Sequence, residues 1–186
     1  MHEPVLHTTI SLRDGAPALL RPYRPGDRSL LLAYWDCLGA DSRRRFGPHA
    51  SDADSIDAFY ADPRHRGFLV LDPSERVVMA YAVIRLGFLP QEAERLRGYG
   101  MRLHETTDAS YAPSVADAWQ GQGIAQQVFD RLLPYLRAMA IQRILLWGGV
   151  QSDNTPALAF YRKNGFVEVG SFAHQGWNHD MQKWIR

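Results

Sequence analysis

The sequence has 186 residues, the length of one ordinary domain. Hydrophobic residues make up 46% and charged residues 22%, values that exclude a disordered, collagen-like or coiled-coil protein. The formal net charge of +1, from 21 basic and 20 acidic residues, is too small to predict a nucleic-acid partner. We expect a single domain over residues 1–186, with residues 1–10 as an N-terminal extension.

Three features favour a cytoplasmic protein with no membrane partner. Cys37 is the single cysteine, so an intrachain disulfide is excluded and a reducing compartment fits. No apolar run approaches the roughly 18 residues of a membrane-spanning helix. Residues 1–4 lack the basic-then-apolar order of a signal peptide.

The first half of the chain mixes short strands and short helices. Residues 1–17 are predicted to be an extension or a hairpin, and Asp27 is predicted to cap a helix that ends at Leu38. The remaining predicted elements are a strand at 18–24, short helices within 41–60, an antiparallel pair of strands at 68–72 and 76–88, and a helical turn at 91–97 inside the irregular segment 89–108.

The second half alternates strands and helices. Apolar residues at i,i+4 spacing from Ile124 to Ala140 predict an amphipathic helix, which Pro134 is expected to kink. The other predicted elements are strands at 110–115 and 143–150, a helix from 155 or 156 to 163 capped by Asn154, and closing strands at 166–171 and 178–185. The strands at 110–115 and 143–150 are predicted to be parallel, because a helix connects them.

A glycine-containing turn stands between the strand at 110–115 and the amphipathic helix, with the sequence Gln120-Gly121-Gln122-Gly123-Ile124-Ala125. A helix start leaves amide groups without partners and carries a partial positive charge, so small residues there suit a phosphate or pyrophosphate. Tight turning or packing is the alternative explanation of such glycines.

Two common phosphate-binding motifs do not fit this turn. A Walker-type loop requires a Gly-Lys-Ser/Thr sequence, which the turn lacks. A dinucleotide fingerprint requires glycine where Gln126 stands and an acidic residue about 20 positions later, where 144–150 has none.

Two C-terminal segments form a pair of motifs: the pattern Gln120-x-x-Gly123-x-Ala125, and a block that runs from Asn154 through Ala157 and Tyr161 to Gly165-Phe166. The first is similar to the acetyl-CoA signature of the GNAT superfamily of N-acetyltransferases, and the second resembles that superfamily's other motif. Four short segments of the first half look like the opening of the protein-lysine acetyltransferase branch: Leu12-Arg13-Asp14-Gly15, Arg21-Pro22, Asp27 and Arg45-Phe46.

This resemblance implies an α/β (α+β) fold, with a mixed, strongly twisted sheet of about six to seven strands and helices on both faces. The fourth strand (110–116) and the fifth (143–150) would splay apart, and the pantetheine arm of acetyl-CoA would lie between them. Pro113 agrees with such a strand, because proline is confined to edges and bulges of sheets.

The resemblance also assigns residues to the coenzyme. Amides of the turn would hold the pyrophosphate, backbone groups near the end of the fourth strand would contact pantetheine, and Gln120 would orient the loop. The coenzyme-binding residues predicted in this way are Ser114, Val115, Gln120, Gly121, Gln122, Gly123, Ile124, Ala125, Asn154, Ala157 and Tyr161. No metal is expected, since His174, His179 and Asp180 lack the spacing of a metal site.

Two catalytic roles follow from the same likeness. Tyr161 matches the position of a general acid, and its phenol, with an ordinary pKa of about 10, can protonate the leaving thiolate. The backbone N–H of Val115 would stabilise the oxyanion. Asn154 would bind pantetheine, cap its helix, or both. Packing on the sheet remains the alternative role for Tyr161.

The general base is where this chain departs from the family. Relatives often carry glutamate on the fourth strand where this chain has Ser110, and serine cannot act as a base unaided. The nearby candidates are Asp117, Glu105, Asp108 and His104, reached through water; alternatively the amine arrives already neutral.

The predicted function is therefore an acetyl-CoA-dependent N-acetyltransferase that acts on a primary amine in a ternary complex. A non-catalytic acetyl-CoA-binding regulatory module is the alternative, because of Ser110. The acceptor, a small molecule or a protein amine, is not encoded in a recognisable motif, and a homodimer is possible. A nucleic-acid interface at Arg43–Arg45 is disfavoured by the balanced charge.

Overall fold

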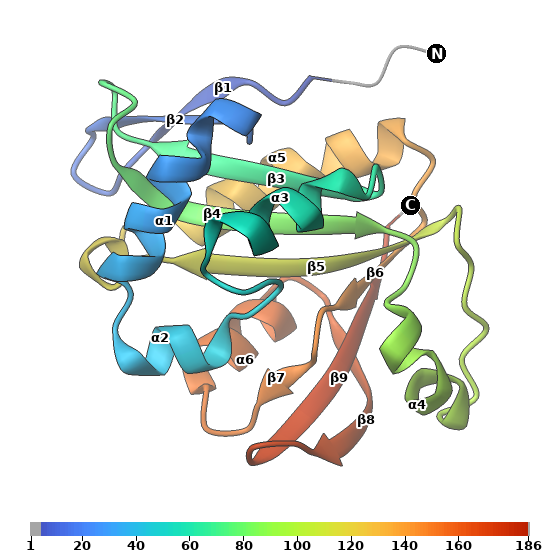
Figure 1. The fold of residues 1–186 in the computed structure, drawn as a ribbon. Helices are drawn as coiled ribbons and strands as arrows, with labels where there is room; N and C mark the ends of the chain where they lie inside the picture. The colour runs from blue at the N-terminus through green and yellow to red at the C-terminus, as the bar shows by residue number, and fades with distance from the viewer. Residues whose placement is uncertain (1–4, 186) are drawn as a thin grey trace. The chain divides into compact units, whose positions relative to one another are not determined.

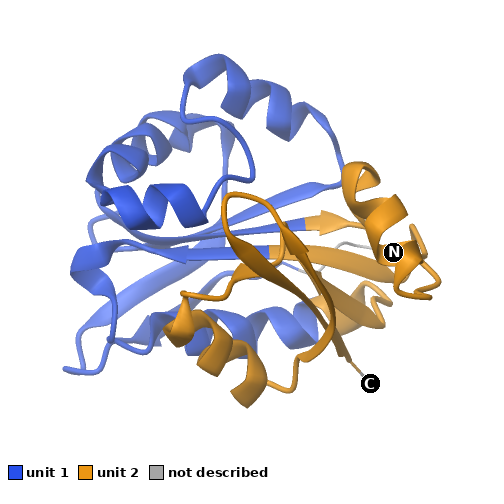
Figure 2. Ribbon diagram, turned by 90° about the horizontal axis from the view of Figure 1, so that it is seen from below, with its two compact units in different colours: residues 1–84, 112–135 blue, residues 85–111, 136–186 orange. Residues whose placement is uncertain are grey.

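The computed structural model describes residues 5–185, which group into two units that we treat separately. The first unit contains residues up to 84 together with 112–135, and the second contains 85–111 together with the chain from 136 onward (Figure 2). Three elements, β4, β5 and α5, pass from one unit into the other. No helix within residues 5–185 combines the length and apolar character that crossing a membrane requires.

The sheet of the first unit begins with an antiparallel hairpin. Strand β1 (Thr8–Ser11) pairs with β2 (Pro17–Pro22), and β2 pairs with β3 (His65–Leu71), again antiparallel. Strand β4 (Val78–Leu86) and the end of β5 (Asp108–Val115) follow in the strand order. The hairpin is one of the two structures predicted for 1–17, and it places residues 8–10 of the expected extension in the sheet. Residues 1–4 lie outside the described part.

Helices cover both faces of this sheet. Helices α1 (Arg28–Cys37) and α3 (Ala53–Ala61) lie on one face and α5 (Ile124–Ala138) on the other (Figure 1). The short α2 (Ala40–Arg45) follows α1. Most of the predicted apolar stripe of α5 is buried, including Ile124, Val128 and Leu132, while Ala140 at its far end is exposed and has a φ of 60°. Helix α5 thus confirms the periodicity read from the sequence over Ile124–Ala138.

Asp27 stands at the N-cap position of α1, as predicted, but its side chain does not cap the helix. A short 3₁₀ turn (Pro25–Asp27) precedes α1, and the Asp27 side chain makes no capping bond to that helix. Instead its carboxylate receives two hydrogen bonds from Arg21, of 2.6 and 2.9 Å, and one from the Arg24 N–H. A buried arginine on β2 competes successfully for the carboxylate, because an unpaired buried charge costs more than a helix cap stabilises.

The second unit is built around a parallel pair of strands. The start of β5 pairs in parallel with β6 (Arg143–Leu146), as predicted. Strand β9 (Trp177–Trp184) then runs antiparallel to three strands: β6, β7 (Val150–Gln151) and β8 (Val167–Ala173). The two predicted closing strands are confirmed, and they pair as an antiparallel hairpin.

The single strand predicted over 143–150 is wrong. It is broken at Trp147-Gly148-Gly149, and β7 beyond the break pairs with β9. Gly148 and Gly149 have φ values of 72° and 69°, which glycine adopts without the penalty of a side chain. This break, together with β1, gives nine strands in the described residues rather than six to seven.

Two helices lie on opposite sides of the β5–β6 pair in this unit (Figure 2). On one side, the turn Pro90–Glu92 leads into α4 (Ala93–Gly98), near the predicted helical turn at 91–97. Phe88, Ala93 and Leu96 form a buried cluster with Leu145 of β6. On the other side lies α6 (Thr155–Lys163), as predicted.

Candidate active site

The glycine turn of the first unit has the shape of an anion cradle. Gly121 and Gly123 have φ values of 77° and 80°, and a Cβ added to either would have no atom within 4 Å. The Gln127 N–H donates to Gly123 O at 3.2 Å, so the amides just before it belong to a first turn that has no intrahelical acceptor. The backbone there is open to a ligand and positively polarised.

Gln120 holds this turn against the end of β5. Its Nε2 donates to Val115 O and to Asp117 Oδ1, both at 3.2 Å. Asp117 also accepts from the Gly39 N–H and the Ser42 hydroxyl, each at 2.6 Å. The Ser42 and Gly39 hydrogen bonds lower the pKa of Asp117. These contacts give Asp117 structural partners, and the loop-orienting role of Gln120 stays a prediction.

Two other predicted coenzyme residues in this unit have distinct surroundings. Ser114 Oγ accepts a hydrogen bond from the Tyr34 hydroxyl at 2.7 Å, so its side chain is occupied and its backbone is what remains for a ligand. Gln122 Oε1 is buried and has no hydrogen-bond partner among the described residues. An unsatisfied buried acceptor is costly, and a ligand N–H or O–H would satisfy it.

The second motif forms α6 in the other unit. Asn154 Oδ1 accepts from the Ala157 N–H at 3.3 Å, so Asn154 caps the helix. Tyr161 is buried and packs against Phe160 and Phe166, with ring centroids 5.4 and 5.2 Å apart. Burial raises the pKa of Tyr161 well above its ordinary value. Its phenol therefore stays protonated at neutral pH and can donate.

Ser110 is not placed to act as a base. It is almost completely buried, and its hydroxyl donates to Gly87 O at 3.3 Å. In the β5–β6 register Ser110 lies opposite Leu145, and Tyr111 lies opposite Leu146. Successive strand residues point to opposite faces, so Ser110 and Tyr111 mark the two faces of this strand pair.

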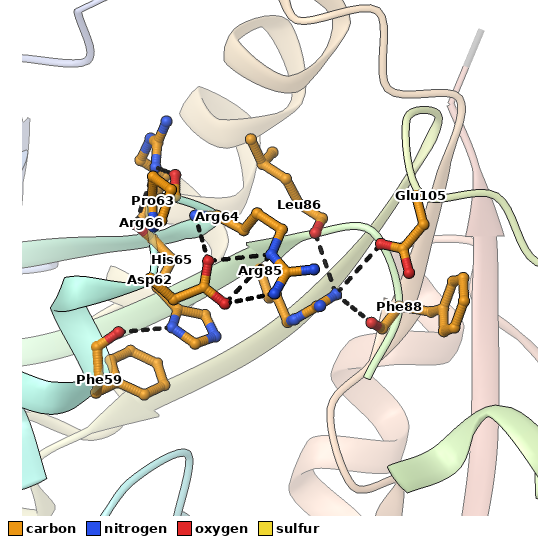
Figure 3. Close-up of polar contacts among 10 residues, drawn as sticks. All are labelled: Phe59, Asp62, Pro63, Arg64, His65, Arg66, Arg85, Leu86, Phe88 and Glu105. Atoms are coloured by element: carbon orange, nitrogen blue, oxygen red, sulfur yellow. Dashed lines mark hydrogen bonds and ion pairs between the residues drawn. The ribbon is translucent and has the colours of Figure 1, made fainter. Parts of the chain in front are cut away.

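Other predicted base candidates in the second unit are also engaged. Buried Asp108 forms an ion pair of 2.6 Å with Arg143 and accepts the His104 N–H. Glu105 lies 3.8 Å from Arg85, which also donates to the carbonyls of Leu86 and Phe88 (Figure 3). These contacts give both carboxylates a structural partner.

One buried carboxylate was missed by the sequence analysis. Glu92 is 5% exposed, and its Oε1 accepts the Gly148 N–H at 2.8 Å and lies 3.2 Å from Arg95 Nη2. Arg95 is bound in turn to Asp180 of β9, at 2.8 and 3.1 Å. Burial raises the pKa of Glu92 to about 7; Arg95 opposes this effect and Asp180 adds to it. No local motif could have found Glu92, because Gly148, which donates to it, and Asp180, which adds to its raised pKa, lie far away in the sequence.

Two of the three residues set aside as metal ligands, His179 and Asp180, have other partners. His179 lies 2.9 Å from Ser152 Oγ and 2.9 Å from Glu168 Oε1. Asp180 is bound by Arg95. Within residues 5–185 no group of three or more His, Cys, Asp or Glu side chains is arranged to hold a metal ion.

Comparisons with known proteins identify the family. A family model described as the acetyltransferase (GNAT) family matches residues 35–166, and the chain belongs to this family. No curated protein matches the chain.

Solved structures share the fold. The GNAT domain of S. lividans PAT is 18% identical, with 97% of each chain covered and a TM-score of 0.75. An acetyltransferase of the GNAT family from Streptococcus pneumoniae is 16% identical, with 91% and 99% covered and a TM-score of 0.66. A spermidine N-acetyltransferase variant from Vibrio cholerae is 19% identical, with 90% and 94% covered and a TM-score of 0.65.

Proposed function

We propose that this protein is an acetyl-CoA-dependent N-acetyltransferase that transfers the acetyl group to a primary amine in a ternary complex. Membership of the acetyltransferase family supports the reaction class. The observation that carries the proposal is the open turn at Gly121 and Gly123, held by Gln120 at the start of α5.

The residues of the turn fit the coenzyme. A pyrophosphate needs several converging N–H donors and no side chain in the way, which the first turn of α5 and its two glycines offer. Pantetheine carries amide N–H groups, and the unpaired Gln122 Oε1 is a suitable acceptor for one of them. In this proposal the amides of Gln122 to Ala125 bind the pyrophosphate, and the backbone of Ser114 and Val115 contacts pantetheine.

Three groups of the chain would serve the reaction. The Val115 N–H would stabilise the oxyanion that forms when the amine adds to the thioester. The Tyr161 phenol, protonated because of its burial, would donate a proton to the departing thiolate. Asn154 caps α6 and thereby holds the helix that carries Tyr161.

The proposal is tested by following thiol release from acetyl-CoA in the presence of spermidine, a lysine-containing peptide and phenylethylamine. We expect at least one amine to accelerate thiol release and its acetylated product to appear by mass spectrometry. Tight acetyl-CoA binding by calorimetry, without thiol release in the presence of any of these amines, would contradict the proposed acetyltransferase activity.

A non-catalytic acetyl-CoA-binding regulatory module is the second candidate. The buried Ser110 favours it, because its hydroxyl is bonded to Gly87 O and offers no base on the fourth strand of the predicted fold. Binding without turnover in the same experiment would select this candidate. Possible homodimerisation and the nature of the acceptor stay predictions.

A further inference from the structure

Glu92 is a buried carboxylate whose surroundings do not neutralise it. Glu92, Asp180 and Arg95 form one cluster, with two acids and one base, so its net charge is −1 when both acids are ionised. Arg95 is oriented toward Asp180 by two hydrogen bonds and lies 3.7 Å over the Phe172 ring. Arg95 cannot fully compensate two buried carboxylates, and the surplus charge falls on Glu92.

One oxygen of Glu92 is available to accept a proton. Within the described residues the contacts of Glu92, from the Gly148 N–H and from Arg95, both fall on Oε1. No donor among these contacts binds Oε2, so its lone pairs are available for a proton. The two contacts on Oε1 also fix the orientation of the carboxylate, as a positioned proton acceptor requires.

Glu92 lies on the same face of the β5–β6 pair as Ser110. Ser110 is directly opposite Leu145, and directly opposite residues of paired strands project to one face. The segment that contains Glu92 packs on this face, because Ala93 and Leu96 contact the cluster that includes Leu145.

Tyr161 belongs to the other face. Tyr111 follows Ser110 on β5 and so points to the opposite side, and the Tyr161 phenol acts electrostatically on Tyr111. Figure 2 shows α4 and α6 on the two sides of this strand pair. The proton acceptor and the proton donor thus flank the strands from opposite sides.

The carboxylate is anchored where β5 and β6 stop pairing. The last register pair is Tyr111 with Leu146, and the Trp147 N–H still donates to Tyr111 O at 3.0 Å. The next amide, that of Gly148, donates to Glu92 instead. This hydrogen bond therefore fixes the Glu92 carboxylate at the point where the pairing of β5 with β6 ends.

We propose that Glu92 is the general base of the acetyl transfer, an inference that rests on the proposed function. Glu92 Oε2 takes a proton from the substrate ammonium, and the neutral nitrogen forms a C–N bond with the acetyl carbon. The C–S bond breaks and the thiolate takes the phenol proton of Tyr161. The tyrosinate recovers a proton from the nitrogen of the collapsing intermediate. One ammonium and one thioester thus give one amide, one thiol and one proton, which Glu92 releases to water.

The proton affinity of Glu92 suits this role. Burial raises the pKa of Glu92 to about 7, against the attraction of Arg95 from α4 and with the repulsion of Asp180 from β9. Tyr99, which follows α4, also interacts with Asp180. A base with a pKa near the working pH combines an ionised population with useful basicity.

The test compares Glu92→Gln with wild type in the amine assay across pH 6 to 10. Glutamine keeps an acceptor for the Gly148 N–H but cannot take the proton. At pH 7 we expect kcat/KM to fall by roughly 10²- to 10³-fold. The rate of the variant should rise with pH and approach wild type near the amine pKa of about 10, where the amine needs no base. Glu94→Gln, at an exposed position two residues later in α4, should match wild type.

Thermal unfolding gives a readout that does not depend on turnover. Removing a buried surplus charge should raise the Tm of Glu92→Gln above wild type at pH 8, whereas loss of a purely structural carboxylate would lower it. Equal rates for Glu92→Gln and wild type at every pH, or a loss that is the same at every pH, would overturn the assignment of Glu92 alone. A wild type that releases no thiol with any amine would overturn the proposed function, and the base with it.

Discussion

Each unit contains an arginine bound to two carboxylates, and the two clusters differ in how exposed the second carboxylate is. In the first unit, Arg21 binds buried Asp27 at 2.6 Å and Glu75 at 2.7 Å, and the Glu75 side chain is 43% exposed. In the second unit, Arg95 binds buried Asp180 at 2.8 Å and Glu92 at 3.2 Å, and the Glu92 side chain is 7% exposed.

This difference decides which cluster can carry out proton transfer. Burial alone would raise the pKa of Asp27, but the hydrogen bonds from Arg21 and the Arg24 N–H outweigh it and lower the pKa. Water solvates the surplus charge on Glu75. In the second cluster water cannot solvate the surplus, and the pKa of Glu92 rises to about 7. The same three residue types therefore make a structural ion pair in one place and a titratable group in the other.

The largest effect should come from breaking the compensated cluster. Asp27→Asn leaves Arg21 buried with only the partly exposed Glu75, and we expect a loss of about 3–5 kcal/mol in the free energy of unfolding. Chemical denaturation would measure it. Glu75→Gln is the matched control and should cost under about 1 kcal/mol, because its carboxylate is partly solvated. Equal losses in the two variants would refute the role of exposure.

The second prediction concerns the stability of the uncompensated cluster as pH changes. The folded-state pKa of Glu92, about 7, lies above its ordinary value of 4.5, so the folded state binds the proton more tightly. Stability from this group is complete below pH 4.5 and is lost as pH rises through 7, by about 3 kcal/mol in total. Glu92→Gln should lack this loss. Unfolding curves at pH 5 and pH 8 would show a larger gain for the variant at pH 8.

A third pair of variants separates binding in the first unit from chemistry in the second. Tyr161→Phe removes the proposed acid, and kcat should fall by roughly 10- to 100-fold with little change in acetyl-CoA affinity. Gly123→Ala places a methyl group in the open cradle at a φ of 80°, and should weaken acetyl-CoA binding by about tenfold while costing about 1 kcal/mol of stability. Calorimetry would measure acetyl-CoA affinity and steady-state kinetics would measure kcat for both variants. A loss of affinity in Tyr161→Phe, or a loss of kcat without loss of affinity in Gly123→Ala, would contradict this prediction.

The smallest effect should be that of the helix cap. Asn154→Ala removes the acceptor for the Ala157 N–H and should cost about 1 kcal/mol. Asn154→Asp keeps an acceptor and should retain most of the stability. If acetyl-CoA affinity also falls in the alanine variant but not in the aspartate variant, the cap also positions the ligand.

The turn and the second motif were predictable because their requirements are local. Glycine at 121 and 123 reflects a left-handed backbone, and Asn154 reflects the need to cap a helix; each is visible within a few residues. The amphipathic pattern of α5 likewise reflects one buried face.

What could not be predicted depends on partners that the local pattern does not reveal. The Asp27 side chain makes no capping bond because Arg21, six residues earlier, binds its carboxylate. Burial raises the pKa of Glu92, and Asp180, 88 positions later in the sequence, adds to this effect, whereas the Gly148 N–H at the strand break opposes it. An apolar run such as 143–150 predicts a strand, but the glycine pair within it permits a turn that periodicity does not reveal.

The hydrogen bonds of Asp117 have a consequence for motion. This carboxylate joins the Gly39 N–H and the Ser42 hydroxyl to Gln120, so the segment between α1 and α2 is tied to the turn before α5. A ligand that rigidifies the turn should also suppress local opening around residue 39. Hydrogen–deuterium exchange at that amide would then slow on coenzyme binding, and Asp117→Asn would uncouple the two segments.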